Sequence, residues 1–354
     1  MQQDNINYMR RALSLARRGA GRVSPNPLVG AVLVKKGKII GEGYHARYGS
    51  AHAEINALES ASSPVKGATL YCTLEPCSHT NKKTSPCAQR IVREGISKVF
   101  IGSLDPNPMV NGKGVSLLRE AGIQVEHGIL ARQNVELNRF YFKHIVSGLP
   151  YVTVKIAQTL DGKISKKRTE QNWLTGTMAQ RKVHKWRSVY DAILVGGNTI
   201  RVDDPQLNVR LVSGRNPLRV IISASLNLPL TAQVFKQDKT NKTIVYTGYR
   251  QTGKMDRKEY EFIELLSDEQ GLLSLKDVLA DLGRRGIASV LVEGGQEIFS
   301  QFIYSDLADE VAVFVVPEVW GSGVTTLDNG PELKLKIQRV QALGDDVLLI
   351  YRRQ

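Results

Sequence analysis

The sequence contains few cysteines and no long apolar segment. Its three cysteines, Cys72, Cys77 and Cys87, lie within one short stretch of the 354 residues. An odd, local group of this kind does not form a disulfide framework, and it fits metal binding in a reducing compartment better. No apolar run approaches the roughly 18 residues that span a bilayer, and the polar segment 1–11 lacks the apolar core of a signal peptide. We therefore expect a cytoplasmic protein with no membrane partner.

A dinucleotide-binding fingerprint and an excess of acidic residues are also absent. No G-x-G-x-x-G segment occurs, which argues against the standard Rossmann phosphate loop. The 48 basic residues outnumber the 34 acidic ones and give a net charge of +14. Such a surplus is typical of nucleic-acid partners, of phosphorylated small molecules, or of surface composition alone. The basic stretch 163–187 has no ladder of aromatic residues of the kind that stacks on single-stranded nucleic acid.

The length predicts two domains, because a single core rarely serves so many residues. The best linker is the segment 147–150, which divides the chain into 1–146 and 150–354. In the first part, helical and strand patterns alternate, which predicts an α/β sandwich. The helical patterns lie at 8–18, 53–61, 86–93 and 115–120, and the strand patterns lie at 28–34, from 39 onward, at 69–74 and at 98–101.

The second part begins a new series of the same kind. Its strand patterns lie at 151–157, 192–195, 219–223, 243–247, 289–292 and 310–316. Its helical patterns lie at 178–190, 275–283 and 297–303. Strands that alternate with helices predict an α/β domain with a mostly parallel sheet.

The stretch with the cysteines carries the chemical signal of the first domain. His52 and Glu54 are followed by two proline–cysteine pairs, at Cys77 and Cys87. One histidine nitrogen and two thiolates are three zinc ligands, and they leave a fourth position open for water, as in catalytic sites. Zinc lowers the pKa of such a water to about 7, and Glu54 is placed to carry protons. This is the general plan of zinc deaminases, whereas Cys72 lies in an apolar strand pattern and fits a buried structural thiol.

The spacing of His52 and Glu54 restricts where the two side chains can converge. In the middle of a helix, residues two apart point to opposite sides. At the first turn, side chains lean towards the N-terminus, so both can face one point. Ser50 is a suitable N-cap for a helix that starts there, and Ser85 as N-cap with Pro86 as first helical residue predicts a second helix start just before Cys87. Helix N-termini favour thiolates, so we expect the metal site at two helix starts.

Five segments of the first domain resemble a known family. They are 25–30 (PNPLVG), 41–45 (GEGYH), 52–54 (HAE), 73–79 (TLEPCSH) and 105–108 (DPNP). Together they look like the deaminase half of the bifunctional deaminase–reductase family of riboflavin biosynthesis. The resemblance implies a cytidine-deaminase-like α/β/α sandwich that deaminates 2,5-diamino-6-(5-phosphoribosylamino)pyrimidin-4(3H)-one and releases ammonia. It implies one zinc ion on His52, Cys77 and Cys87, with Glu54 as the proton shuttle.

The same resemblance implies that Asn26, His45 and His79 line the pyrimidine pocket. The loop between the two cysteines departs from the family, because nine residues separate them where eight are expected. The extra residue falls in the polar loop tip 81–83, which can absorb it. Deaminases of tRNA and related nucleic-acid bases have only two residues between these cysteines. The long spacing therefore argues against an enzyme that edits nucleic-acid bases.

Three segments of the second domain follow strand patterns and carry glycines or charges. They are 155–162 (KIAQTLDG), 196–205 (GGNTIRVDDP) and 293–295 (EGG). Glycine between a strand and a helix start lets phosphate approach backbone N–H groups, although each segment alone is a weak indication. Together they resemble the reductase half of the same family, whose fold is similar to dihydrofolate reductase. The resemblance implies NADPH as hydride donor and reduction of the ribosyl group to ribityl.

Carried over by position, the resemblance implies two sets of contacts. The cofactor contacts are Ala157, Trp173, Thr199, Asp203, Gly295, Gln296 and Glu297. The substrate contacts are Gln171, Arg187, Leu207, Arg210 and Glu293. The arginine fork suits a 5′-phosphate, and Lys155 and Asp203 are the candidates for polarising or protonating the reacting sugar. The plainer alternatives are solvated surface charges for Lys155 and Arg187, a core anchor for Trp173 and a helix cap for Asp203.

The second domain departs from the family at three places. Thr159 and Gln171 stand where serines are expected, and Ser223 with Ala224 stands where an aspartate with serine or threonine is expected. These changes concern details of cofactor and substrate binding. A second hypothesis is a zinc nucleobase deaminase that acts on nucleic acid and has an inactive C-terminal domain. Under the first hypothesis the partner is a phosphorylated pyrimidine and not nucleic acid, and a homodimer is compatible with it.

Overall fold

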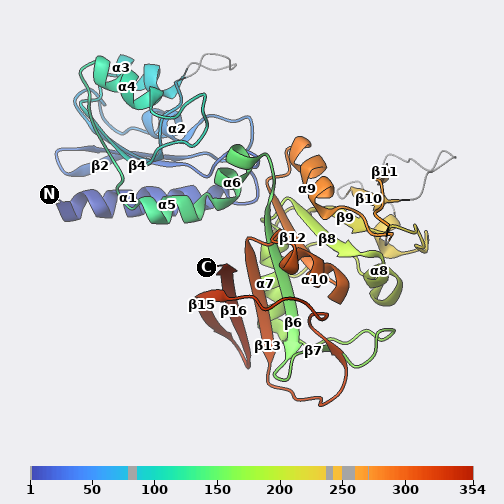
Figure 1. The fold of residues 1–354 in the computed structure, drawn as a ribbon. Coiled ribbons are helices and arrows are strands. Elements are labelled where there is room, and N and C mark those ends of the chain that lie inside the picture. Colours follow the sequence, from blue (N-terminus) through green and yellow to red (C-terminus); the bar gives the residue numbers. More distant parts are fainter. Residues whose placement is uncertain (1, 79–85, 237–241, 249–259, 270, 354) are drawn as a thin grey trace. The chain divides into compact units, whose positions relative to one another are not determined.

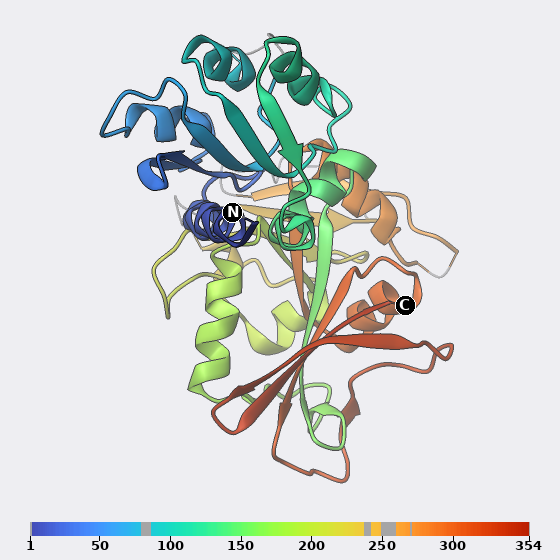
Figure 2. The ribbon, with the colours of Figure 1, turned by 90° about the vertical axis from the view of Figure 1, so that its left-hand side faces the viewer.

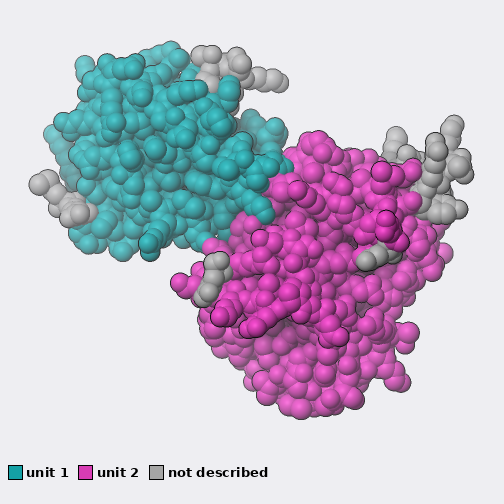
Figure 3. All heavy atoms as spheres, in the orientation of Figure 1, with its two compact units in different colours: residues 1–148 teal, residues 149–354 magenta. Residues whose placement is uncertain are grey.

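The computed structural model describes residues 2–78, 86–236, 242–248, 260–269 and 271–353. It divides into two compact units, Met1–Gly148 and Leu149–Gln354, each built around its own main sheet (Figure 3). Within the described ranges, no helix is both long enough and apolar enough to cross a bilayer.

The first unit is a five-stranded sheet with helices on both faces (Figure 1). In spatial order, its strands are β2 (Lys38–Tyr44), β1 (Gly30–Lys35), β3 (Thr69–Leu74), β4 (Lys98–Ser103) and β5 (Gln124–His127). β1 pairs antiparallel with β2 and β3, whereas β3, β4 and β5 are parallel. The helices are α1 (Gln2–Ala16), η1 (Arg17–Gly19), α2 (Ala53–Glu59), α3 (Cys87–Arg93), α4 (Lys113–Glu120), α5 (Ala131–Leu137) and α6 (Arg139–Ser147). The predicted α/β/α sandwich is confirmed.

Two apolar cores attach the helices to the two faces of this sheet. On one face, Leu33, Leu70 and Ile101 pack with side chains of α2, α3 and α4. On the other face, Val32 and Tyr71 pack with α1 (Figure 1). Successive strand residues point to opposite faces, so neighbours in β1 and β3 serve different cores.

β1 and β2 form a hairpin, and its turn explains the glycine there. Lys36 and Gly37 both have positive φ, at 50° and 73°. Two central residues with positive φ match the type I′ turn that suits the twist of a two-residue hairpin. Lys35 and Lys38 pair across it.

The two predicted helix starts are shifted from the expected caps. α2 begins at Ala53 with His52 as its N-cap residue, so Ser50 is not the N-cap. The hydroxyl of Ser50 instead donates to the carbonyl of Arg47 at 2.7 Å and closes a local turn. α3 begins at Cys87 with Pro86 as its N-cap residue rather than its first helical residue, and Ser85 lies outside the described residues.

The second unit contains a nine-stranded sheet. In spatial order, its strands are β11 (Tyr260–Glu264), β10 (Thr243–Thr247), β9 (Leu218–Ile222), β8 (Ala192–Gly196), β12 (Ser289–Gly294), β6 (Tyr151–Thr159), β13 (Glu310–Val316), β16 (Asp346–Arg353) and β15 (Leu335–Leu343). From β11 to β13 all neighbours are parallel, and β16 and β15 form an antiparallel hairpin at one edge, drawn in red in Figure 2. A separate pair joins β7 (Lys163–Ser165) to β14 (Val324–Thr325). The predicted mostly parallel sheet is confirmed.

Helices cover both faces of this sheet as well. They are α7 (Thr177–Arg187), α8 (Gly197–Asp203), η2 (Gln233–Phe235), α9 (Leu275–Arg284) and α10 (Gln296–Tyr304). One core joins α9 and α10 to the sheet, and a second joins α8 to the opposite face of β8 and β9. α7 packs with β13 and β16 in a third core. The fold class of both halves agrees with the sequence prediction.

Candidate active sites

Two helix starts and one loop bring three metal-binding side chains together in the first unit. The Nδ1 atom of His52 lies 3.2 Å from Sγ of Cys87 and 3.6 Å from Sγ of Cys77. The backbone N–H of Cys87 donates to Sγ of Cys77 at 3.4 Å. All three ligand atoms lie within 4.8 Å of one another. The three predicted metal ligands therefore converge on one point.

The geometry of this cluster fits a zinc ion. A tetrahedral zinc with bonds of about 2.0 Å to nitrogen and 2.3 Å to sulfur places its ligand atoms roughly 3.5–3.8 Å apart. The observed separations are close to that range. A hydrogen bond from the Cys87 thiol lowers the pKa of Cys77 to about 3, so a thiolate, the form that binds metal, is already favoured there.

Close packing between α2 and the β1–β2 hairpin fixes the position of His52. A side chain at Gly43 would overlap the carbonyl oxygen of Ala53, the first residue of α2. The amide of Asn56 donates to the carbonyl of Tyr44 at 2.8 Å and binds the same helix to β2. The start of α2 therefore lies directly against the end of this strand, where His45 follows.

Glu54 lies in the first turn of α2, and its side chain is almost completely buried. Burial is the largest influence on this carboxyl and raises its pKa above the ordinary value, while the neighbouring His52 opposes the shift. A carboxyl with a raised pKa can both accept and release a proton near neutral pH. The structure thus places a buried carboxyl with a raised pKa two residues from the first metal ligand.

Asn26 and His45 lie beside the metal cluster, as predicted for a pyrimidine pocket. The ring of His45 meets that of His52 edge-on, with centroids 5.5 Å apart. Nδ1 of His45 lies 3.1 Å from the carbonyl of Ala51, and its Nε2 lies 3.3 Å from the Asn26 amide nitrogen. Donation from Nδ1–H leaves Nε2 as acceptor for that amide, so the contacts select one tautomer. His79, the third predicted pocket residue, lies outside the described residues.

Two buried residues that the sequence reasoning missed support the segments beside the metal cluster. Asn138, between α5 and α6, accepts from the N–H of Leu28 at 2.7 Å and donates to its carbonyl at 2.9 Å. These bonds fix the segment that carries Asn26. Glu75 accepts backbone N–H bonds from the loop after β4 and from the start of α4. It therefore attaches the predicted 105–108 segment to the chain just before Cys77.

The second unit brings Lys155, Arg187 and Glu293 together. Val292 pairs with Val154, so Glu293 and Lys155 follow side by side on β12 and β6. Arg187, at the end of α7, donates to both carboxylate oxygens of Glu293, at 2.8 and 2.7 Å. Burial lowers the pKa of Lys155, although the charge of Glu293 opposes the shift. The alternative that Lys155 and Arg187 are solvated surface charges is therefore wrong.

The loop after α8 carries two further predicted substrate residues, Leu207 and Arg210, and a third, Gln171, precedes α7. Arg187 also donates to the carbonyl of Asn208 at 3.1 Å, and the N–H of Arg210 donates to Nδ1 of His184 at 3.2 Å. The side chain of Leu207 is buried in the core, so a substrate would contact its backbone. The Gln171 amide donates to the carbonyl of Asp203 at 3.4 Å.

The turn from β12 into α10 is suited to a phosphate-bearing cofactor. A side chain at Gly294 would place its Cβ 3.0 Å from the hydroxyl of Thr199, tighter than an ordinary contact. Gly295 is the N-cap residue of α10, and the first backbone N–H groups of a helix have no acceptor within the helix, so they can bind a phosphate. The Gln296 amide donates to Thr325 at 2.9 Å, while its buried oxygen has no partner among the described residues. These groups fit the predicted NADPH contacts.

The remaining predicted cofactor contacts lie on β6, before α7, at the end of α8 and in the first turn of α10. Ala157 lies on β6 opposite Phe314 of β13. Trp173 is 70% exposed, so it is not a core anchor. Glu297 lies in the first turn of α10, 3.5 Å from a guanidinium nitrogen of Arg168. Burial raises the pKa of Asp203, the last residue of α8, which favours its protonated form.

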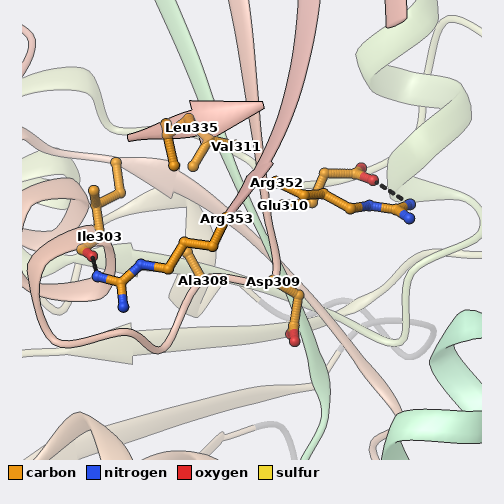
Figure 4. Close-up of a pocket in the computed structure, with 8 residues that line it drawn as sticks. All are labelled: Ile303, Ala308, Asp309, Glu310, Val311, Leu335, Arg352 and Arg353. Atoms are coloured by element: carbon orange, nitrogen blue, oxygen red, sulfur yellow. Dashed lines mark hydrogen bonds and ion pairs between the residues drawn. The ribbon is translucent and has the colours of Figure 1, made fainter. Parts of the chain in front are cut away.

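A small cavity of the second unit lies apart from these residues. It is lined by Leu335 and by parts of 303–311 and 352–353 (Figure 4). Its volume of about 10 Å³ has room for a single water and not for a substrate. Glu310 and Arg352 form an ion pair of 3.0 Å there. Because Glu310 begins β13, the cavity lies at the opposite end of the parallel strands from Gly294.

Comparison with known proteins covers both units. The model of the cytidine and deoxycytidylate deaminase zinc-binding region matches residues 2–103, and the RibD C-terminal domain matches residues 150–349. The riboflavin biosynthesis protein RibD of Aquifex aeolicus is 40% identical over 98% of both chains. The chain belongs to the RibD family.

Other RibD proteins agree in sequence and in structure. RibD of Escherichia coli is 34% identical over 97% of both chains. A diaminohydroxyphosphoribosylaminopyrimidine deaminase/5-amino-6-(5-phosphoribosylamino)uracil reductase from Thermotoga maritima is 38% identical over 99% of both chains, with a TM-score of 0.90. Acinetobacter baumannii RibD is 36% identical over 100% of both chains, with a TM-score of 0.91.

Membership in the RibD family defines the class of reactions. The chain is a bifunctional deaminase and reductase of riboflavin biosynthesis, with a zinc-binding deaminase part and a reductase part that uses NADPH. The alternative of a nucleic-acid deaminase with an inactive second half is not favoured, because RibD relatives match both halves.

Proposed function

We propose that the enzyme deaminates 2,5-diamino-6-(5-phosphoribosylamino)pyrimidin-4(3H)-one and then reduces the ribosyl group of the product to ribityl. The observation that carries this proposal is the convergence of His52, Cys77 and Cys87 within 4.8 Å, beside the buried carboxyl of Glu54. The activities in the name of the Thermotoga maritima relative support the same substrate. We assign deamination to residues 1–146 and reduction to residues 150–354.

In the deaminase part, the chain binds the pyrimidine and moves protons. His52, Cys77 and Cys87 would hold zinc, which supplies a Lewis acid that activates water at neutral pH. Glu54 accepts a proton from the water and delivers it to the departing amino group, so water is consumed and ammonia is released. Asn26 and His45 orient the ring through hydrogen bonds, and we assign His79 to the same pocket.

In the reductase part, bound NADPH would supply the hydride for reduction of the sugar at C1′. We assign its binding to Ala157, Trp173, Thr199, Asp203, Gly295, Gln296 and Glu297. Lys155 and Asp203 are the candidates for proton transfer, since burial shifts the pKa of each toward its neutral form. Gln171, Leu207 and Glu293 would line the sugar site.

Arg187 and Arg210 have different roles in this proposal. Arg187 uses its fork for Glu293 and for the carbonyl of Asn208, so it orders the sugar site through these partners. The guanidinium of Arg210 contacts the side chain of Asn208 at 3.2 Å in an exposed setting. Arg210 is therefore the residue that we assign to the 5′-phosphate.

We also propose a cytoplasmic enzyme that forms homodimers and does not act on nucleic acid. The three cysteines are all free, which suits a reducing compartment. The edge strand β15 exposes Ile337 and Val340 at 54% and 58%, an apolar edge that a second copy could cover. Light scattering at micromolar concentration tests the dimer, which a monomer mass would exclude.

The test of the proposed function is turnover of the purified enzyme. The diaminopyrimidinone ribotide is supplied with and without NADPH, and ammonia release and NADPH oxidation are followed together. We expect ammonia without NADPH, and NADPH oxidation after ammonia release when both are present. Release of no ammonia by the zinc-loaded enzyme would contradict the substrate assignment, and nucleosides and RNA would then be assayed.

A further inference from the structure

Helix α7 contacts the loop 204–210 at two points one helical turn apart. His184 and Arg187 are three residues apart, so their side chains share one face of α7. Arg187 donates to the carbonyl of Asn208 at 3.1 Å. The backbone N–H of Arg210 donates to Nδ1 of His184 at 3.2 Å. The loop is therefore held on both sides of its residue 209.

The backbone of this loop needs external support. Asp204 and Leu207 adopt left-handed conformations, with φ of 38° and 49°. Residues other than glycine disfavour this region, and they keep such a conformation only where surrounding contacts hold the backbone in it. The buried side chain of Leu207 is one support, and the contacts with α7 at Asn208 and Arg210 are the next.

We propose that His184 is a positioning residue of the reductase, whose Nδ1 acceptor holds the backbone of Arg210 so that its guanidinium is presented to the substrate phosphate. This inference rests on the proposed function, which assigns Arg210 to that phosphate. His184 itself touches neither substrate nor cofactor in this account. It acts through one hydrogen bond to the loop.

The surroundings of His184 keep this acceptor available. The side chain is only 4% exposed. Burial, assisted by the positive charges of Arg187 and Arg210 and opposed by Glu293, lowers its pKa to about 4. At neutral pH the ring is therefore uncharged, and the hydrogen bond to Nδ1 selects the tautomer with its proton on Nε2.

A matched pair of variants isolates the acceptor. In His184→Asn, the side-chain oxygen can occupy the position of Nδ1, whereas His184→Leu keeps the bulk without an acceptor. In His184→Leu, an unpaired buried N–H should raise KM for the deaminated substrate roughly 5- to 100-fold. The kcat value and the KM for NADPH should stay within about twofold, since neither depends on Arg210. In His184→Asn, KM should return to within about threefold of wild type.

The assay uses the full chain with the deaminated intermediate, and tryptophan fluorescence of the same samples reports that the second unit, which contains all three tryptophans, is folded. Arg210→Ala is measured in parallel to separate the inference from the assignment beneath it. If Arg210→Ala leaves KM unchanged, the phosphate assignment fails. If Arg210→Ala raises KM but His184→Leu does not, or if Leu and Asn at position 184 behave alike, the role of His184 is overturned.

Discussion

Replacement of Glu293 by glutamine should destabilise the second unit by about 3 kcal/mol, the lower end of the cost of breaking a buried ion pair. The side chains of Arg187 and Glu293 are only 12% and 7% exposed. Both carboxylate oxygens accept from Arg187, at 2.8 and 2.7 Å. Glutamine keeps one acceptor but removes the negative charge, which leaves Arg187 as a buried cation without its partner.

A more exposed bidentate pair of arginine and glutamate provides the control. Arg285 donates to both carboxylate oxygens of Glu261, each at 3.0 Å, and these side chains are 34% and 48% exposed. Glu261→Gln should cost less than about 1 kcal/mol, because water screens an exposed pair. Both substitutions replace a carboxylate by an amide, but the Glu261 pair is more exposed and Arg285 keeps a second partner, Asp281, at 2.7 Å.

Tryptophan fluorescence during urea unfolding measures this difference in the second unit alone. The three tryptophans, Trp173, Trp186 and Trp320, all belong to that unit. We expect Glu293→Gln to lower the urea midpoint clearly and Glu261→Gln to change it little. Equal midpoints for the two variants would refute the reasoning that burial of the Arg187 pair decides its contribution.

Three further predictions concern metal, pocket and pH. Cys87→Ser should lower bound zinc from one ion per chain to nearly none and abolish ammonia release, while reduction of the supplied intermediate continues; retained zinc would contradict the ligand assignment. Asn138→Ala should raise the deaminase KM roughly 5- to 100-fold, the effect of losing buried hydrogen bonds that position the Asn26 segment, with zinc content unchanged. A KM equal to wild type would remove Asn138 from the pocket support. Because the folded pKa of His184 lies near 4 and the ordinary value is 6.5, the unfolded chain takes up a proton first as the pH falls. The second unit should therefore lose up to about 3 kcal/mol of stability between pH 6.5 and pH 4. His184→Asn should reduce this loss in urea titrations across that range, and an unchanged pH dependence would exclude the titration of His184 as its cause.

The parts of the molecule that could be predicted are those with local or ordered signals. Alternating strand and helix patterns predicted the fold class of both halves, and Cys77 and Cys87 with His52 predicted the metal cluster. The convergence of His52 and Glu54 at a helix start followed from helix geometry. The prediction of Ser50 as N-cap was wrong, because its hydroxyl donates to the carbonyl of Arg47 in a local turn. The sequence does not show whether such a hydroxyl caps a helix or closes a turn.

The supporting residues could not be predicted, because their contacts have no fixed spacing along the chain. Asn138 binds Leu28 across 110 residues, and Glu75 binds the Gly114 amide across 39. The edge hairpin of β15 and β16 was also missed. In β15 most residues are exposed, so burial does not impose the alternation that marks a half-buried strand.

The measurement that tests the central claim most directly compares wild type with Glu54→Gln under two supplies of substrate. The diaminopyrimidinone ribotide and the deaminated intermediate are each given with NADPH, and ammonia and NADPH are followed. We expect the variant to release no ammonia and oxidise no NADPH from the first substrate, yet to oxidise NADPH normally from the second. Ammonia release by the variant at the wild-type rate, or failure to reduce the supplied intermediate, would contradict two ordered sites on one chain.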